Sequence, residues 1–129
     1  MDDFSKYIGL EFEIGGRGPK YDCWGYVQYL LDDYFALSVP SFENYEDWRT
    51  VHTRFVEIGV KKLTEQGWKV AERPNLANIL LFRVRGRPLH VGLAVGSLRF
   101  LHIQEGMLSV LDRLDARWYP RLEGIYEYH

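Results

Sequence analysis

The chain has 129 residues, a length typical of one domain, and we expect a single domain over residues 1–129. A net charge of −2 gives no electrostatic basis for binding nucleic acid or an anionic membrane surface. The sequence has no apolar run of transmembrane length, and its first residues lack the basic and apolar regions of a secretory signal. We therefore expect synthesis in a cytoplasm, without insertion into a membrane.

The N-terminal half is interpreted as a glycine-rich loop followed by two helices. Residues 15–19 form the loop, and Asp22 then offers a side-chain oxygen that can cap a helix. This first helix should end before Pro40, and a second is predicted over residues 45–66, with Gly67 as its stop. Helical spacing in the first helix is shown by its apolar residues, Trp24, Val27, Leu30, Leu31 and Tyr34.

After Pro74 the pattern changes to short apolar or alternating runs, which are typical of strands. The predicted strands cover residues 79–84, 90–95, 99–104, 108–114 and 124–129. Because local turns join them, we expect an antiparallel sheet. Helices that precede strands in the chain favour an α+β fold over a doubly wound parallel sheet. Asp112 and Asp115, with the arginines near them, are interpreted as a solvated turn.

Cys23 is the single cysteine, so an intrachain disulfide is excluded. A lone cysteine is most often a small buried hydrophobic residue. If Asp22 caps the helix, however, Cys23 lies in its first turn, where unpaired N–H groups and the helix dipole stabilise a thiolate. The same N–H groups can receive an oxyanion. Gly25 keeps the next turn slim, so that substrate or another strand can approach.

A cysteine nucleophile needs a base, usually histidine, and a group that orients this base. His52 lies among polar residues of the second predicted helix, and His129 is the last residue, so neither is favoured. His90 and His102 remain, on adjacent strands of one predicted hairpin.

The length of the hairpin turn decides whether His90 and His102 share a face of the sheet. A three-residue turn at 96–98 pairs Val95 with Arg99 and puts both histidines on one face, whereas a two-residue turn would separate them. We expect the tip of the cysteine helix to dock on the histidine face, where small residues leave room. That face consists of His90, Gly92, Ala94, Phe100, His102 and Gln104. The opposite, apolar face consists of Val91, Leu93, Val95, Leu101 and Ile103.

Two histidines and a cysteine are also potential zinc ligands. A structural zinc site normally has four protein ligands, with a close pair such as Cys-x-x-Cys that this chain lacks. A zinc site in this chain would need Asp22 or Gln104 as its fourth ligand. The glycine-rich loop is not followed by the Lys-Ser/Thr of a phosphate-binding loop. We therefore expect no metal and no cofactor.

Three stretches, in this order, resemble the NlpC family of papain-like cysteine peptidases: GGRGPKYDCWGYVQYLL, NILLFRVRGRPLHVGLAVG and RFLHIQEG. The resemblance extends over residues 8–128. It implies a cysteine-bearing helix packed on a five- or six-stranded antiparallel sheet. It also implies Cys23 as the nucleophile, His90 as the general base and His102 as the residue that orients the base.

The resemblance further implies a substrate and a location. Members of the family cleave peptidoglycan stem peptides, typically between D-glutamate and diaminopimelate or a similar third residue. The Asp-Cys-Trp-Gly form resembles the tail-associated branch of tailed bacteriophages and gene-transfer particles. We therefore expect a protein of the virion tail, in contact with other tail-tip proteins, that opens the cell wall for DNA entry.

Contacts with the oxyanion and the substrate are assigned to Asp22, Trp24, Gly25, Phe12 and Gln104. Phe12 stands where many members carry a tyrosine near the oxyanion site, which predicts weaker activity. Ala77-Asn78 replaces a usual Gly-Asp pair, as a turn variation. Two alternatives stay open. One is a catalytically weak or silent tail-tip assembly protein that retains the fold, and the other is an amidase or acyltransferase that uses the same three residues.

Overall fold

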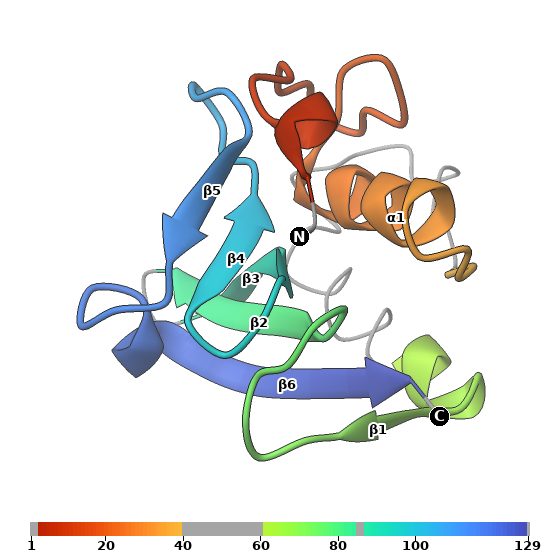
Figure 1. Ribbon diagram of the computed structural model, residues 1–129, viewed down its shortest axis with the longest axis vertical. Coiled ribbons are helices and arrows are strands. Elements are labelled where there is room, and N and C mark those ends of the chain that lie inside the picture. Colours follow the sequence, from red (N-terminus) through yellow and green to blue (C-terminus); the bar gives the residue numbers. More distant parts are fainter. Residues whose placement is uncertain (1–2, 40–60, 85–86, 129) are drawn as a thin grey trace.

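A six-stranded sheet organises the computed structural model, which describes residues 3–39, 61–84 and 87–128 (Figure 1). Its strands in chain order are β1 (Trp68–Val70), β2 (Ile79–Val84), β3 (Arg87–Ala94), β4 (Arg99–His102), β5 (Val110–Arg113) and β6 (Leu122–Tyr128). Within the sheet they follow the order β1-β6-β2-β3-β4-β5, and each neighbouring pair is antiparallel. The predicted α+β class and antiparallel sheet are confirmed.

The strand predicted over residues 79–84 is confirmed as β2, and the other predicted strands are confirmed with ends shifted by one to three residues. β3 begins at Arg87 and β4 already ends at His102. The edge strand β1, which pairs with β6, was not predicted from the sequence. With three residues it is too short to show a period.

The predicted first helix is confirmed as α1 (Cys23–Asp33), which packs against β3 and β4 (Figure 1). Its N-cap is Asp22, whose side-chain Oδ1 accepts the N–H of Gly25 at 2.6 Å. This is the cap that the sequence predicted, and it fixes Cys23 as the first residue of the helix.

The remaining helical segments are short. Two 3-10 helices, η1 (Ser5–Tyr7) and η2 (Tyr119–Arg121), lie near the start and the end of the chain. Residues 61–65 are helical, and the chain turns at Gly67, where the sequence predicted the end of the second helix. The rest of that predicted helix, which includes His52, lies outside the described residues, and so does His129. No helix of the described residues has the length and apolar character needed to cross a membrane.

The register predicted for the β3–β4 hairpin is confirmed. Leu93 pairs with Leu101 and Ala94 with Phe100, and the backbone N–H of Val95 donates to the carbonyl oxygen of Arg99 at 3.0 Å. A three-residue turn therefore joins the strands, and His90 and His102 share one face of the sheet.

The prediction that the tip of the cysteine helix docks on the histidine face is wrong. α1 packs on the opposite, apolar face, where Val91, Leu93, Leu101 and Ile103 join its own buried residues in one cluster. The histidine face is covered by a second cluster, which contains Phe82, Phe100, Leu114 and Trp118. Both faces of the central strands are therefore buried, and the tip of α1, with Cys23 and Trp24, lies on the apolar side.

The loop before α1 passes very close to the helix at Gly25. A Cβ atom at this position would lie 2.2 Å from the carbonyl oxygen of Gly16 and 3.1 Å from Nη1 of Arg17. The sequence predicted an approach of substrate or another strand at Gly25, and the segment that lies there is the chain's own loop. Arg17 in turn holds the buried carboxylate of Asp22 at 2.8 Å, so the loop and the helix tip are joined by an ion pair.

Replacing Gly25 by alanine should therefore push the loop away from the helix tip. We expect Gly25→Ala to lower the free energy of unfolding by about 1–3 kcal/mol, the usual cost of overpacking. Urea denaturation of this variant beside Asp32→Ala, an exposed position on the same helix, measures the effect. Equal stability of the two variants would contradict the packing described here.

Candidate active site

Cys23 lies buried at the N-terminal tip of α1, with 5% of its surface exposed. The neighbouring Asp22 carboxylate is fully buried, and its two oxygens hold the N–H of Gly25 and the guanidinium of Arg17. These contacts give Asp22 a clear task, which is to fix the backbone on which the thiol is carried.

Burial decides the protonation of the Cys23 thiol. Burial raises the pKa of Cys23 to about 12, and the negative charge of Asp22 adds to the rise. Hydrogen bonds from the backbone N–H groups of Val91 and Trp24 lower this pKa without outweighing the burial. The expectation that the helix N-terminus holds a thiolate is therefore wrong for the resting protein. The resting Cys23 side chain is a neutral thiol, which could act as a nucleophile only after a base removes its proton.

The hydrogen bond from Val91 shows where Cys23 meets the sheet. In the β3–β4 register, the residue opposite Val91 would be Ile103, but β4 already ends at His102. The N–H of Val91 is instead directed to the Cys23 sulfur. The tip of α1 therefore contacts β3 beyond the end of β4, at the residue next to His90.

His90 and His102 form a direct hydrogen bond, with 2.9 Å between Nε2 of His90 and Nδ1 of His102. The register places His102 opposite Gly92, so the two histidines are diagonal neighbours, within reach across an antiparallel pair. A Cβ atom at Gly92 would lie 3.2 Å from Cβ of His102 and 2.9 Å from the Phe100 ring. Glycine at this position gives the histidine rings the room to meet.

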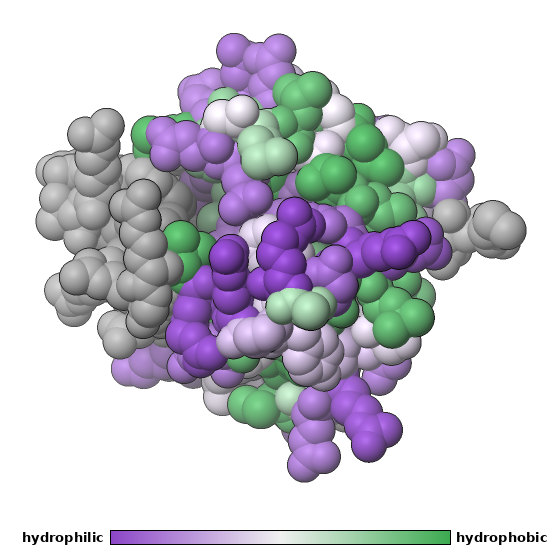
Figure 2. Space-filling model, turned by 90° about the vertical axis from the view of Figure 1, so that its left-hand side faces the viewer, coloured by the Kyte–Doolittle hydropathy of each residue, from purple (hydrophilic) through white to green (hydrophobic). Residues whose placement is uncertain are grey.

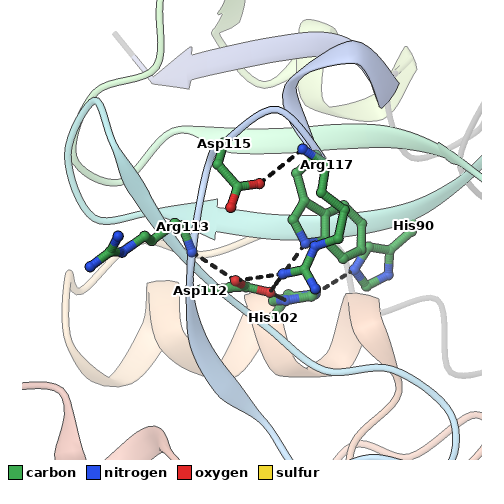
Figure 3. A network of polar contacts seen from close by, with 7 residues as sticks. His90, His102, Asp112, Arg113, Asp115 and Arg117 are labelled. Carbon is green, nitrogen blue, oxygen red and sulfur yellow. Dashed lines mark hydrogen bonds and ion pairs between the residues drawn. The ribbon is translucent and has the colours of Figure 1, made fainter.

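The histidine pair continues to a carboxylate on β5. Nε2 of His102 lies 3.1 Å from Oδ2 of Asp112, which also accepts the indole N–H of Trp118 at 3.1 Å (Figure 3). Nη2 of Arg117 lies 3.0 Å from Oδ1 and 3.1 Å from Oδ2, and the backbone N–H of Arg113 donates to Oδ1 at 2.8 Å. The interpretation of Asp112 as part of a solvated turn is wrong.

The surface beside β5 explains why Asp112 was interpreted as part of a solvated turn. Figure 2 looks onto the side of the molecule that carries β5, where hydrophilic side chains gather near the centre. In the chain, Arg113, Asp115 and Arg117 are exposed. Leu114 and Trp118, which alternate with them or follow them, are buried. The segment is solvated on its outer side, and its inner side covers the histidines.

Aromatic rings enclose the histidine pair. The Trp118 ring lies 4.9 Å from the His102 ring and 5.7 Å from the His90 ring, and Phe100 lies 4.4 Å from His102. Burial lowers the pKa of His102, although the bond and the charge of Asp112 act in the opposite direction. His102 is therefore a neutral imidazole at pH 7, with one nitrogen that donates and one that accepts.

Comparison with known proteins shows the family to which this chain belongs. The model of the NlpC/P60 family matches residues 9–126. The chain belongs to the NlpC/P60 family. Among solved structures, the NlpC/p60 domain of the peptidoglycan hydrolase SagA superposes with a TM-score of 0.64 at 17% identity, over 95% of this chain and 90% of that one. A lipoprotein-like member from Staphylococcus aureus Mu50 gives 0.61 at 19% identity, over 96% of this chain and 38% of that one.

A curated NlpC/P60 relative is the murein DD-endopeptidase MepS/murein LD-carboxypeptidase of Escherichia coli K12. The two sequences are 30% identical over 124 residues, which is 94% of this chain. The aligned part is 56% of the relative, so the chain spans little more than half of its length. The same protein from the strains O6:H1 and O157:H7 gives the same figures.

The residues that the sequence assigned to oxyanion and substrate contacts lie around Cys23 and at the end of β4. Trp24, the second residue of α1, is buried in the core. Phe12 is half-buried against the same cluster and forms a backbone bridge to Tyr21. Gln104 is half-buried just beyond β4, where its carbonyl oxygen accepts the N–H of Met107. Among the described residues, no group of three or more His, Cys, Asp or Glu side chains is arranged to hold a metal ion.

The departure from the NlpC/P60 pattern at Ala77-Asn78 lies in a turn before β2. Ala77 has a φ of 68°, in the left-handed region that favours glycine. The Asn78 side chain accepts the N–H of Asn75 at 2.8 Å, a bond that an aspartate could make equally well. Both substitutions keep the turn, and neither residue takes part in the histidine–carboxylate network described above.

A hollow of about 320 Å³ lies on the solvent side of α1. Its lining includes Arg17, Tyr21, Gly25, Gln28, Tyr29 and Asp32. Tyr21 and Gly25 lie two residues before and after Cys23, so this hollow adjoins the helix tip from the side opposite the sheet.

The raised pKa of Cys23 predicts an unusual pH dependence of alkylation. Because the folded thiol stays protonated up to about pH 12, the rate with iodoacetamide should still be rising at pH 10. The same protein in guanidinium chloride should level off above roughly pH 9.5, since an unfolded cysteine has a pKa of about 8.5. A native rate that levels off below pH 8 would show a resting thiolate and contradict the neutral thiol.

Proposed function

We propose that this chain is a cysteine endopeptidase that hydrolyses the stem peptides of peptidoglycan. The observation that carries the proposal is the position of Cys23, on a capped helix tip that contacts β3 beside the hydrogen-bonded His90–His102 pair. A buried thiol, a neighbouring base and a residue that orients the base are the parts of a thiol hydrolase.

The proposed reaction has two steps. In the first, His90 takes the thiol proton as the Cys23 sulfur attacks the scissile carbonyl carbon and forms a C–S bond. The C–N bond then breaks, and His90 returns the proton to the leaving amine. In the second, water attacks the thioester with His90 as base, which releases the carboxylic acid and restores the thiol.

The oxyanion of each tetrahedral intermediate is proposed to lie at the N-terminus of α1. The backbone N–H of Cys23 is the principal donor, because the N–H of Gly25 already binds Asp22 and that of Trp24 is directed to the sulfur. Such a donor contributes about 3–4 kcal/mol of transition-state stabilisation in hydrolases.

The choice of peptidoglycan rests on the relatives. The SagA domain comes from a peptidoglycan hydrolase, and the curated relative is a murein endopeptidase. The scissile bond that we propose is the one between D-glutamate and diaminopimelate or a similar residue. The name of the curated relative instead specifies DD-endopeptidase and LD-carboxypeptidase activities. Identification of the products decides among these bonds and also tests for amidase or acyl-transfer products.

We also propose that the protein acts from a phage-like tail tip, together with other tail-tip proteins, at the cell wall. The support for this location is the Asp-Cys-Trp-Gly sequence around Cys23. Mass spectrometry of purified particles tests it, since a tail component co-purifies with the particle at fixed stoichiometry. A protein found only in the lysate would overturn the location, while leaving the peptidase proposal in place.

Hydrolysis can be measured directly on purified muropeptides by liquid chromatography and mass spectrometry. We expect cleavage by the wild type and a loss of at least about 1,000-fold in kcat for Cys23→Ala and for His90→Ala, since the thiol and its base act as one unit. Cys23→Ser, which keeps the shape of the side chain, should lose nearly as much. Wild-type protein that cleaves none of several wall types would favour the assembly-protein alternative, and cleavage by Cys23→Ala would exclude this thiol as the nucleophile.

A further inference from the structure

Asp112 extends the histidine pair beyond the three residues that the sequence identified. We infer that Asp112 is a positioning residue, whose carboxylate fixes the tautomer of His102 and, through it, that of His90. The inference rests on the proposed peptidase function, because the purpose of this order is to leave a bare nitrogen on His90 for the Cys23 thiol.

The register of three strands brings these groups into one line. On β4 and β5, His102 pairs with Val110 and Phe100 with Asp112, so Asp112 is the diagonal neighbour of His102. His90 stands in the same diagonal relation to His102 across β3 and β4. The side chains therefore follow one another on a single face of the sheet, as Figure 3 shows.

The order of the hydrogen atoms follows from the carboxylate. Ionised Asp112 can only accept, so the contact of 3.1 Å requires the hydrogen of His102 to be on Nε2. Nδ1 of the neutral His102 is then bare, and it must accept the hydrogen of Nε2 of His90 across 2.9 Å. Nδ1 of a neutral His90 is bare in consequence, and it is the nitrogen that can take the proton of the thiol.

Asp112 is held in the ionised form that this order needs. Partial burial raises its pKa, but the hydrogen bonds from the Arg113 N–H and from His102, together with the charge of Arg117, outweigh it, so the net pKa is lowered. The indole N–H of Trp118 and Nη2 of Arg117 bind the oxygens from the remaining sides. The carboxylate is thus fixed in orientation as well as in charge.

Without the carboxylate, His102 can carry its hydrogen on either nitrogen. With the hydrogen on its Nδ1, His102 would donate to Nε2 of His90. A neutral His90 would then carry its own hydrogen on Nδ1, the nitrogen that must be bare to take the thiol proton. A charge-assisted hydrogen bond favours one tautomer by about 10- to 100-fold. The same factor is therefore the expected contribution of Asp112 to kcat.

The test reads the tautomers of ¹⁵N-labelled histidine by two-bond ¹H–¹⁵N correlation at pH 7, without substrate. In the wild type we expect both His90 and His102 to carry hydrogen on Nε2. In Asp112→Asn, His102 should populate the Nδ1–H form, and kcat on muropeptides should fall about 10- to 100-fold with KM changed less than about 3-fold. The matched control is Asp115→Asn, an exposed carboxylate in the same segment, which should change neither reading.

Each result is decisive for the inference. Hydrogen on Nδ1 of His102 in the wild type, a doubly protonated His102 at pH 7, or unchanged tautomers in Asp112→Asn would overturn it. If Asp112→Asn fails to fold, the wild-type spectrum alone still decides, because the predicted order is a property of the native site. Expected tautomers in a protein that cleaves no muropeptide would support the positioning role and contradict the peptidase, so the two failures are distinguishable.

Discussion

The three-residue turn between β3 and β4 is the constraint on which the site depends. It fixes a register in which Leu93 pairs with Leu101, and this register alone puts His90 and His102 on one face, at the diagonal separation that a hydrogen bond spans. A turn shorter by one residue would move one histidine to the face that α1 covers. The glycine opposite His102, Gly92, is the second requirement, because a side chain there would occupy the space in which the rings meet.

Burial explains how the Cys23 thiol and the His90–His102 pair depend on each other. A thiol at a helix tip is usually acidified, but Cys23 has so little exposed surface that desolvation prevails and the resting sulfur is neutral. Such a thiol reacts only if a base beside it takes the proton at the moment of attack. The same aromatic cover that shields His102 from water also keeps this imidazole neutral, so that it can accept from His90 instead of repelling it.

The sequence predicted the parts of the fold and the site that depend on near neighbours in the chain. The cap by Asp22 and the turn at 96–98 are of this kind, and they place Cys23 and the histidine pair. The docking face of the helix tip was predicted wrongly, because a face with small residues is not necessarily the open one. Here Trp118, 16 residues beyond His102, fills it.

Asp112 was missed for a related reason. Exposed arginines surround it in the sequence, and charge density of this kind is normal for a turn. Only the pairing of β4 with β5 shows that its side chain points inward, and a short strand with half-buried residues gives no clear alternation. β1 is a similar case, since its three residues gain their strand conformation from β6 rather than from a pattern of their own.

The central claim is that the Cys23 thiol and the His90–His102 pair act as one nucleophilic unit. Its most direct test is intact-mass spectrometry of protein quenched in acid within milliseconds of mixing with a synthetic stem-peptide ester, a substrate whose acylation step is fast. We predict a transient mass increase equal to the acyl group, located at Cys23 by peptide mapping and lost in His90→Ala. An acyl group on another residue, or equal acylation of wild type and His90→Ala, would contradict the account.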